Sequence, residues 1–422
     1  MQNRNNIVIK IDICYNFSVF TKINQSLEVD FMLRKKYYFY KKTLFLVLTL
    51  FVVGMFTACE QEQSIDNKTV NDTNKTDNTK TTKNTIETLK TEDMKEKFGE
   101  NCISEQTFEV ELSEYSGKVY FVPFAPSKDN QDFSIQIIQD GKVLTNIHTY
   151  IPDELTKEKF SSLDAVSFFD INYDGNTDIV LIETYGDKTF AAIYYGFSSD
   201  ADDYEKFFIS QDELSKKISS QLQEVSIPEI RNLLSNGKKN DKFTSYQEAY
   251  EAVSKLCEME STEEKGYNLI YFNDDDIPEL VVGVNGYYTS LYTYSDGKVY
   301  TLMDHWTYGA MGNAGYEYCP RKNSLRNYNN DYAGAIFYTT YMTMNNQYSL
   351  DTVTQIKTYN FDDVNGNGIP DENETDSIGY YSVSYIGDTQ ITDEECASYN
   401  VGEYQYIQTE MDLETLKAKL NN

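Results

Sequence analysis

The chain has 422 residues, of which 40% are hydrophobic, so it is long and apolar enough to form one or two cores. Its 37 Lys and Arg residues against 67 Asp and Glu give a formal net charge of −30, which excludes a general nucleic-acid-binding protein because a polyanion would be repelled. Six cysteines are too few for a disulfide-stapled scaffold, and two histidines leave little room for histidine-based catalysis.

Residues 1–58 have the composition of an export signal. A basic stretch from Met32 to Lys42 precedes an apolar run from Leu44 to Phe56, and small residues follow. This order is typical of a secretory signal peptide. The residues before Met32 do not read as a targeting segment, so we expect Met32 to be the natural start.

The segment Phe56-Thr57-Ala58-Cys59 resembles a bacterial lipobox, with Phe56 at the position where Leu is usual. The resemblance implies that Cys59 is lipidated and becomes the mature N-terminus. A diacylated and amide-acylated cysteine would hold the protein stably on the outer face of a bacterial cytoplasmic membrane. The alternative is a retained transmembrane anchor, although the 13 residues of the apolar run are fewer than the roughly 20 that a membrane span needs.

Residues 59–97 are dominated by Asn, Thr, Lys, Asp and Glu. Such a segment cannot bury enough apolar surface to offset its ordering entropy, so we predict a disordered linker after the lipidated cysteine. Its root-mean-square reach would be roughly 30–35 Å. Because residues 1–58 hold eight basic and three acidic residues, their removal would change the net charge from −30 to −35.

The rest of the chain predicts an α+β, β-rich fold of two lobes, 98–235 and 236–422, built mainly of antiparallel strands with a few short helices. In the first lobe, alternating apolar residues open at Phe108, and two strands flank Asp140-Gly141 as a hairpin. Further predicted strands are 179–182 and 190–195, and predicted helices lie near 211–223 and 228–234.

The second lobe follows the polar segment 236–241. Ser245 with Glu248 predicts a capped helix start, and Thr392 with Glu395 predicts another. The remaining expected elements are strands at 267–272, 280–284, 287–294 and 298–303, and a final helix at 412–420.

The sharpest motif is an acidic loop at residues 170–178. Oxygen-bearing side chains at positions 1, 3, 5 and 9, with Gly175 at position 6, suit Ca²⁺, which prefers six to eight oxygen ligands. Leu181 stands where an EF-hand has Glu, and an apolar strand follows. The loop therefore resembles those of FG-GAP and VCBS repeats. The resemblance implies four side-chain ligands and one backbone carbonyl, from Asp170, Asn172, Asp174 and Asp178, and from Asn176.

Residues 363–374 form a second candidate, which resembles an EF-hand-type or thrombospondin-type-3-type loop. Gly368 is at position 6, and two Asn in place of Asp predict weaker affinity for Ca²⁺. The candidate ligands are Asp363, Asn365, Asn367, Ile369 through its carbonyl, Asp371 and Glu374.

The third candidate, with Asn273, Asp275 and Glu279, is a degenerate copy of such a loop. Position 1 is Tyr271, and position 6 is Asp276 instead of Gly. An acidic turn without metal is the favoured interpretation, and a weak metal site is the alternative.

The stretch from Tyr287 to Ala335, with its segment Tyr308-Gly-Ala-Met-Gly-Asn-Ala-Gly-Tyr, resembles uncharacterised clostridial-type lipoproteins, for which no activity is known to carry over. Four aromatic residues nearby form either a sugar-binding platform or, as we favour, packing on a strand face. They are Trp306, Tyr308, Tyr316 and Tyr318.

Together these features predict an exported lipoprotein that uses structural Ca²⁺ and serves as a binding or adhesion module at the cell surface. One alternative is a lipoprotein that captures a carbohydrate or peptide, and another is a cell-wall or glycan hydrolase, although no catalytic signature is found. The expected partners are the membrane, through the lipid, and a cell-wall glycan or protein ligand. Disulfide pairing among Cys102, Cys257, Cys319 and Cys396 stays open.

Overall fold

The computed structural model describes residues 91–128, 130–197, 207–235 and 242–421. The predicted export signal, the lipidated Cys59 and the linker as far as residue 90 lie outside these residues. Within the described ranges, no helix is long and apolar enough to cross a membrane.

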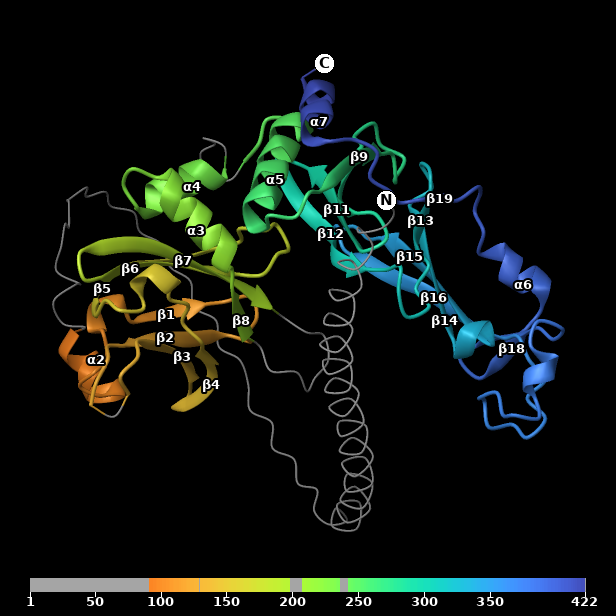
Figure 1. The fold of residues 1–422 in the computed structure, drawn as a ribbon, viewed down its shortest axis with the longest axis horizontal. Helices are drawn as coiled ribbons and strands as arrows, with labels where there is room; N and C mark the ends of the chain where they lie inside the picture. Colours follow the sequence, from red (N-terminus) through yellow and green to blue (C-terminus); the bar gives the residue numbers. More distant parts are fainter. Residues whose placement is uncertain (1–90, 129, 198–206, 236–241, 422) are drawn as a thin grey trace, which may run out of the picture. The chain divides into compact units, whose positions relative to one another are not determined.

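The described residues form four antiparallel β-sheets and a few short helices (Figure 1). The predicted β-rich class, with mainly antiparallel strands, is therefore confirmed. The division into two lobes at residues 235 and 236 stays a prediction.

The first sheet is a four-stranded meander in which each strand pairs with the next. The predicted hairpin around Asp140-Gly141 is present, and it joins the last two strands of this sheet. The strands are β1 (Phe108–Glu111), β2 (Lys118–Phe124), β3 (Ser134–Gln139) and β4 (Lys142–Ile147), and the short helices η1 (Ser104–Gln106) and η2 (Asp153–Leu155) flank them.

Helix α2 (Thr91–Phe98) corrects the predicted extent of the linker, which we expected to run to residue 97. Met94 and Phe98, one helical turn apart, pack against a small cluster that contains Val122. The polar composition of the segment hides this pair, which gives the last turns of the linker an apolar face to bury.

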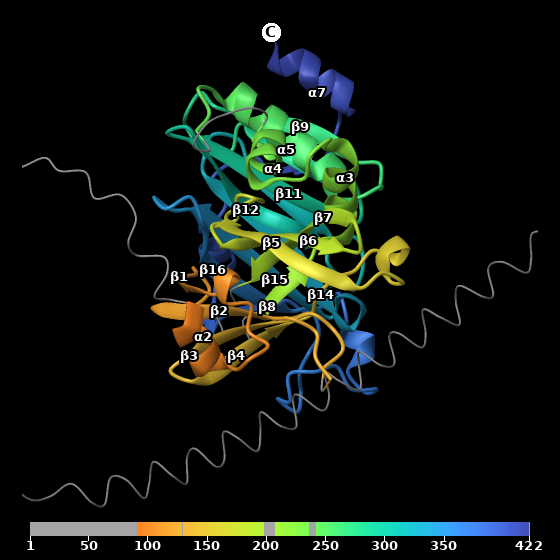
Figure 2. The ribbon, with the colours of Figure 1, turned by 90° about the vertical axis from the view of Figure 1, so that its left-hand side faces the viewer.

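The second sheet, β5–β8, packs one face against the first sheet and the other against helices (Figure 2). Ile179 and Leu181 of its second strand contact the core between the two sheets, whereas Val180 and Ile182 contact the helices. This alternation follows from the two-residue period of a strand. The elements are β5 (Phe160–Phe169), β6 (Asp178–Tyr185), β7 (Lys188–Phe197), β8 (Phe207–Ser210), α3 (Asp212–Gln221) and α4 (Ile227–Leu234).

The third sheet repeats this plan. Leu280 and Val282 of its second strand pack toward helix α5 (Tyr246–Glu260), and Val281 packs toward the fourth sheet. Leu256 of α5 also contacts the helical side of the β5–β8 sheet, so one helix serves both cores. The strands are β9 (Gly266–Ile270), β10 (Glu279–Val284), β11 (Tyr288–Ser295) and β12 (Lys298–Thr307).

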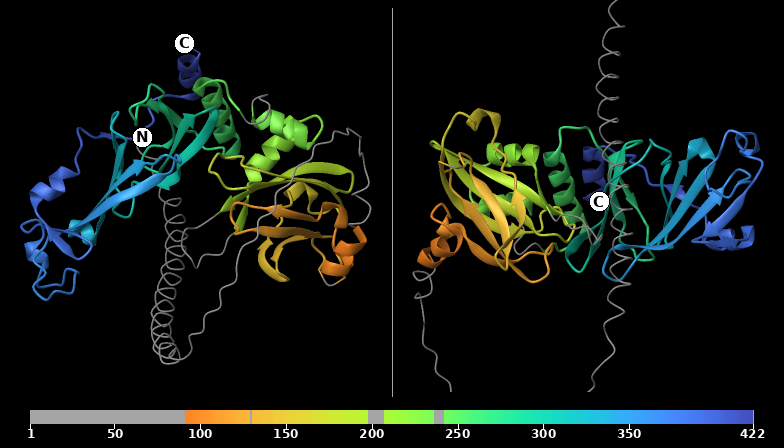
Figure 3. Two further views of the ribbon diagram at one scale, coloured as in Figure 1. Left: turned by 180° about the vertical axis from the view of Figure 1, so that it is seen from behind. Right: turned by 90° about the horizontal axis from the view of Figure 1, so that it is seen from below.

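The fourth sheet has seven strands, in the order β18-β17-β16-β15-β14-β13-β19, and appears in blue in Figure 3. Its strands are β13 (Gly315–Cys319), β14 (Ser324–Asp331), β15 (Ile336–Met344), β16 (Leu350–Tyr359), β17 (Val383–Ile386), β18 (Thr389–Ile391) and β19 (Gln405–Tyr406). The remaining elements are η4 (Tyr332–Gly334), η5 (Thr375–Ser377), α6 (Asp393–Ser398) and α7 (Leu413–Leu420).

The helix starts follow the predicted chemistry with one difference. Thr392 and Glu395 form the expected reciprocal capping box of α6. At α5, the Ser245 hydroxyl accepts a hydrogen bond from the Glu248 amide, but the Glu248 carboxylate accepts from the amide of Thr244. The reciprocal bond is thus displaced by one residue. The four cysteines in the described ranges are free thiols.

Candidate calcium loops

The loop at residues 170–178 connects β5 to β6, and its last acid closes it. The two carboxylate oxygens of Asp178 accept hydrogen bonds from the Ile171 amide at 2.6 Å and from the Gly196 amide at 2.9 Å. Asp178 is completely buried, and it is the first residue of the doubly covered strand β6. The closing carboxylate is therefore fixed by the sheet.

The other side chains of this loop bond to its own backbone. Asp170 accepts from the Gly175 amide at 3.0 Å, and Asp174 accepts from the Asn176 amide at 2.7 Å. Gly175 has a positive φ of 85°, which glycine adopts readily, so the predicted sharp turn at position 6 is present. Asn172 donates its side-chain amide to Asp174 at 3.1 Å.

In the described structure, the carboxyl groups of the loop have no positively charged side chain to compensate them. Burial, followed by the nearby charge of Asp174, raises the pKa of Asp170 to about 6. Burial also raises the pKa of Asp178 well above its usual range. In the part of the chain that the structure describes, no lysine, arginine or histidine forms an ion pair with these three carboxyl groups.

The donor set fits Ca²⁺ in kind, because carboxylate, amide and carbonyl oxygens are its preferred ligands. The carboxylates are not gathered, however: no group of three or more His, Cys, Asp or Glu side chains is arranged as a metal site among the described residues. Each carboxylate of the loop is instead turned to an N–H group, and its oxygens keep further lone pairs.

The 170–178 loop also connects two sheets. Thr301 of β12 donates its amide to the Tyr173 carbonyl at 2.9 Å and its hydroxyl to the Asn172 carbonyl at 3.0 Å. The Tyr173 ring lies 6.4 Å from the ring of Phe243. The conformation of the loop is therefore coupled to the packing of the β9–β12 sheet.

Glu114, which no sequence pattern indicates, lies between β1 and β2 and supports the loop from outside. Its Oε1 accepts from the Thr177 amide at 2.6 Å, while its buried Oε2 has no hydrogen-bond partner in the described structure. A side chain at Gly196 would collide with Oε1, since a Cβ there would lie 2.5 Å away. Because 63 residues separate Glu114 from Thr177, no local pattern could reveal this contact.

The loop at residues 271–279 repeats part of the hydrogen-bond pattern of the loop at 170–178, with residue 271 in the place of 170. Its backbone differs, because Tyr173 and Gly175 have positive φ and no residue of 271–279 does. Its closing acid, Glu279, accepts from the Phe272 amide at 2.8 Å, as Asp178 accepts from Ile171. Asn273 donates to Asp275 at 2.7 Å, which reproduces the Asn172–Asp174 bond. Both loops also join the first and second strands of a four-stranded meander.

The copy differs from the first loop in its charges. Arg321 donates to the Asp275 carbonyl at 3.0 Å and to the Asp276 carboxylate at 3.4 Å. Its guanidinium also lies over the ring of Tyr271, 4.5 Å from the ring centroid. The chain itself thus brings a positive charge to this loop. The side chains of Asn273, Asp275 and Glu279, which the sequence offers as a weak metal site, are held by hydrogen bonds, and burial raises the pKa of Glu279 to about 7.

The loop at residues 363–374 follows β16 and closes in the same way at position 12. Buried Glu374 accepts from the Val364 amide at 2.9 Å and from the Asp371 amide at 3.1 Å. The side-chain amides of Asn365 and Asn367 both donate to Asp371, at 2.6 Å and 3.2 Å.

Two further bonds complete the loop. Asp363 accepts from the Gly368 amide at 2.9 Å, and Ile369 donates its amide to Asn367 at 2.9 Å. All the predicted candidate ligands of this loop therefore lie within one continuous hydrogen-bonded turn.

The four aromatic residues for which strand-face packing is the favoured interpretation each contact another of the four or a buried cluster. Trp306 and Tyr316 lie 5.4 Å apart and contact a buried cluster, in which Tyr318 is only 8% exposed. The ring of Tyr308 stands edge-on to Tyr316 at 6.2 Å. This arrangement agrees with the favoured interpretation of strand-face packing.

A scan against protein-family models finds no match to this chain, and a search among curated proteins finds no similar sequence.

Proposed function

We propose that this chain is an exported, lipid-anchored protein of a bacterial surface, whose β-rich body is a calcium-stabilised binding module. The observation that carries the proposal is the 170–178 loop. It holds the completely buried carboxyl group of Asp178 beside the carboxylate of Asp170, which accepts the Gly175 amide. It also offers oxygens from Asn172, Asp174 and Asn176, and its three carboxyl groups form no ion pair among the described residues.

The physical argument concerns the free energy of ionisation. Burial without a counter-charge disfavours ionised carboxylates, and it raises the pKa of both aspartates. A bound divalent cation would reverse this effect and hold the side chains inward. Because the loop bonds to Thr301 of β12, the free energy of Ca²⁺ binding would stabilise the contact between two sheets as well as the loop.

The anchor half of the proposal is supported by the order of basic, apolar and small residues that ends at Cys59. A lipid anchor followed by a polar linker would hold the folded body away from the membrane. The Cys59→Ala variant should lose its lipid-dependent mobility shift and leave the membrane fraction. If it stayed membrane-bound with unchanged mobility, the retained transmembrane anchor would be correct.

The calcium half is tested by thermal unfolding of the intact chain, in millimolar Ca²⁺ and in excess EGTA, together with metal analysis of the purified protein. We expect bound calcium and a reversible fall of the melting temperature in EGTA. Equal melting temperatures in the two buffers, with no metal retained, would contradict the proposal.

A further inference from the structure

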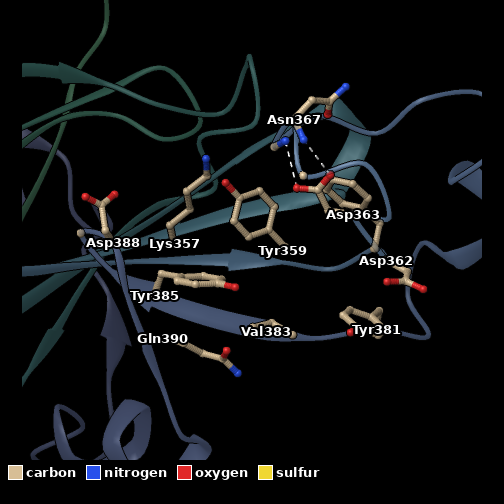
Figure 4. Close-up of a pocket in the computed structure, with 14 residues that line it drawn as sticks. Lys357, Tyr359, Asp362, Asp363, Asn367, Tyr381, Val383, Tyr385, Asp388 and Gln390 are labelled. Atoms are coloured by element: carbon tan, nitrogen blue, oxygen red, sulfur yellow. Dashed lines mark hydrogen bonds between the residues drawn. The ribbon is translucent and has the colours of Figure 1, made fainter.

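A groove of about 650 Å³ lies along β16, β17 and β18, beside the 363–374 loop (Figure 4). Its volume is within the range of about 300–1,000 Å³ that is usual for small-molecule sites. Asp363, Gly366, Asn367 and Gly368 of the 363–374 loop line one end of the groove. No sequence pattern indicates the rest of it, because the other residues come from three strands and their connections.

The floor of the groove is one face of the sheet. Lys357 pairs in register with Tyr385, Tyr359 pairs with Val383, and Tyr385 pairs in turn with Gln390. Directly paired residues point to the same side of an antiparallel sheet, so these five side chains form a continuous surface. The rings of Tyr359 and Tyr385 are edge-to-face, with centroids 5.7 Å apart. They supply flat apolar area with a hydroxyl at the rim.

Charges of both signs surround this aromatic floor. The Lys357 ammonium lies over the Tyr359 ring at 4.5 Å, and Figure 4 shows the two side chains next to each other. Asp362, Asp363 and Asp388 line the groove as well. Gln390 adds an amide, which both donates and accepts hydrogen bonds.

This combination selects a class of ligand. The aspartates repel an anionic ligand, and a cation on the aromatic face would meet Lys357, which already makes the cation–π contact there. A neutral molecule with many hydroxyl groups suits both the acidic and the basic side chains of the groove, because each hydroxyl can donate to a carboxylate or accept from an ammonium or amide. The C–H faces of sugar rings also suit tyrosine rings.

We infer that the groove on β16–β18 binds a neutral saccharide, with the ring of Tyr385 as the stacking surface and Tyr359 edge-on beside it. The inference rests on the proposed function in treating the chain as a binding module, and it does not require calcium.

The test is calorimetric titration of the intact chain, in a detergent without a sugar headgroup. The probes are maltohexaose, cellohexaose, xylohexaose, N-acetylated chitotetraose and a lysine-rich peptide. We expect at least one of the saccharides to bind, and Tyr385→Ala to weaken that binding roughly tenfold or more, as the loss of a central aromatic contact does. Tyr385→Phe keeps the ring and should stay within about threefold of the wild type.

The matched control is Tyr380→Ala, because Tyr380 is close in sequence, 91% exposed and outside the groove. It should leave the affinity unchanged. The melting temperatures of all variants check that they fold.

Three results would overturn the inference: no saccharide binds, binding is unaffected by Tyr385→Ala in a folded variant, or only the lysine-rich peptide binds. Its failure is distinct from that of the proposed function. If a saccharide binds but EGTA does not lower the melting temperature, the calcium proposal alone is contradicted. If EGTA lowers the melting temperature but no saccharide binds, this inference alone is contradicted.

Discussion

The loops at 170–178 and 271–279 share two side-chain hydrogen bonds but differ in how their charges are compensated. In both, the closing acid accepts the amide of position 2, and the Asn at position 3 donates to the Asp at position 5. The first loop has Asp170 at position 1, whereas the second has Tyr271 with Arg321 over its ring. The comparison teaches that side-chain-to-backbone hydrogen bonds shape both loops, and that the loops differ in the negative charge left without a positive partner.

The largest effect is expected from paired substitutions at position 5 of the two loops. Asp174→Ala should abolish the stabilisation by Ca²⁺, which we expect to be about 5–15 °C in melting temperature, because it removes a ligand from the uncompensated loop. Asp275→Ala should leave that stabilisation intact. Thermal unfolding of each variant with Ca²⁺ and with EGTA measures both. If both variants lost the same amount of stabilisation by Ca²⁺, the proposed difference between the two loops would be wrong.

A second test uses Glu183, on the strand that follows the first loop. The equivalent residue after the second loop is apolar Val284, whereas Glu183 is completely buried and neither of its carboxylate oxygens has a hydrogen-bond partner in the described structure. Burial raises the pKa of Glu183 to about 8. Between its ordinary pKa of 4.5 and about 8, the folded state therefore keeps a proton that the unfolded state has lost.

The sign follows from this difference in proton binding. The contribution of Glu183 to the free energy of unfolding falls as the pH rises from about 4.5 to about 8. Glu183→Leu should remove that slope, and at pH 8 it should stabilise the protein by about 1–3 kcal/mol relative to the wild type. Urea unfolding at pH 5 and pH 8 measures it, with exposed Glu111→Leu as the control. The predicted sign would be wrong if the difference in free energy of unfolding between Glu183→Leu and the wild type were less favourable to the variant at pH 8 than at pH 5.

A smaller effect is expected at Arg321. Arg321→Met removes the hydrogen bond to the Asp275 carbonyl and the contact with Tyr271, and it should destabilise the protein by about 1 kcal/mol because the side chain is partly exposed. The loss should be the same in Ca²⁺ and in EGTA. The neighbouring Lys322→Met variant is the control in the same unfolding experiment. Recovery of the lost stability by Ca²⁺ would show that the second loop also takes an ion.

Features that depend on neighbouring residues were predictable from the sequence. The β10 and β11 strands, the capping of α6 and the turn at Gly175 all follow from local patterns of apolar residues, hydroxyls and glycine. The spacing of oxygen-bearing residues was enough to locate all three acidic loops. The linker boundary was wrong because composition does not report a single buried pair such as Met94 and Phe98.

The sequence by itself determined the acidic charge, the β-rich class and the position of the loops, because composition, strand periodicity and ligand spacing are properties of short segments. Only the tertiary structure decided which loop carries its own positive charge. Arg321 lies 46 residues from Asp275, and it reaches the loop because the turn between β13 and β14 bonds to the carbonyls of Tyr271 and Phe272. The same holds for Glu114 at the first loop and for the groove of Tyr359 and Tyr385. Contacts of this kind form only when chain folding brings distant segments together, and no local pattern encodes them.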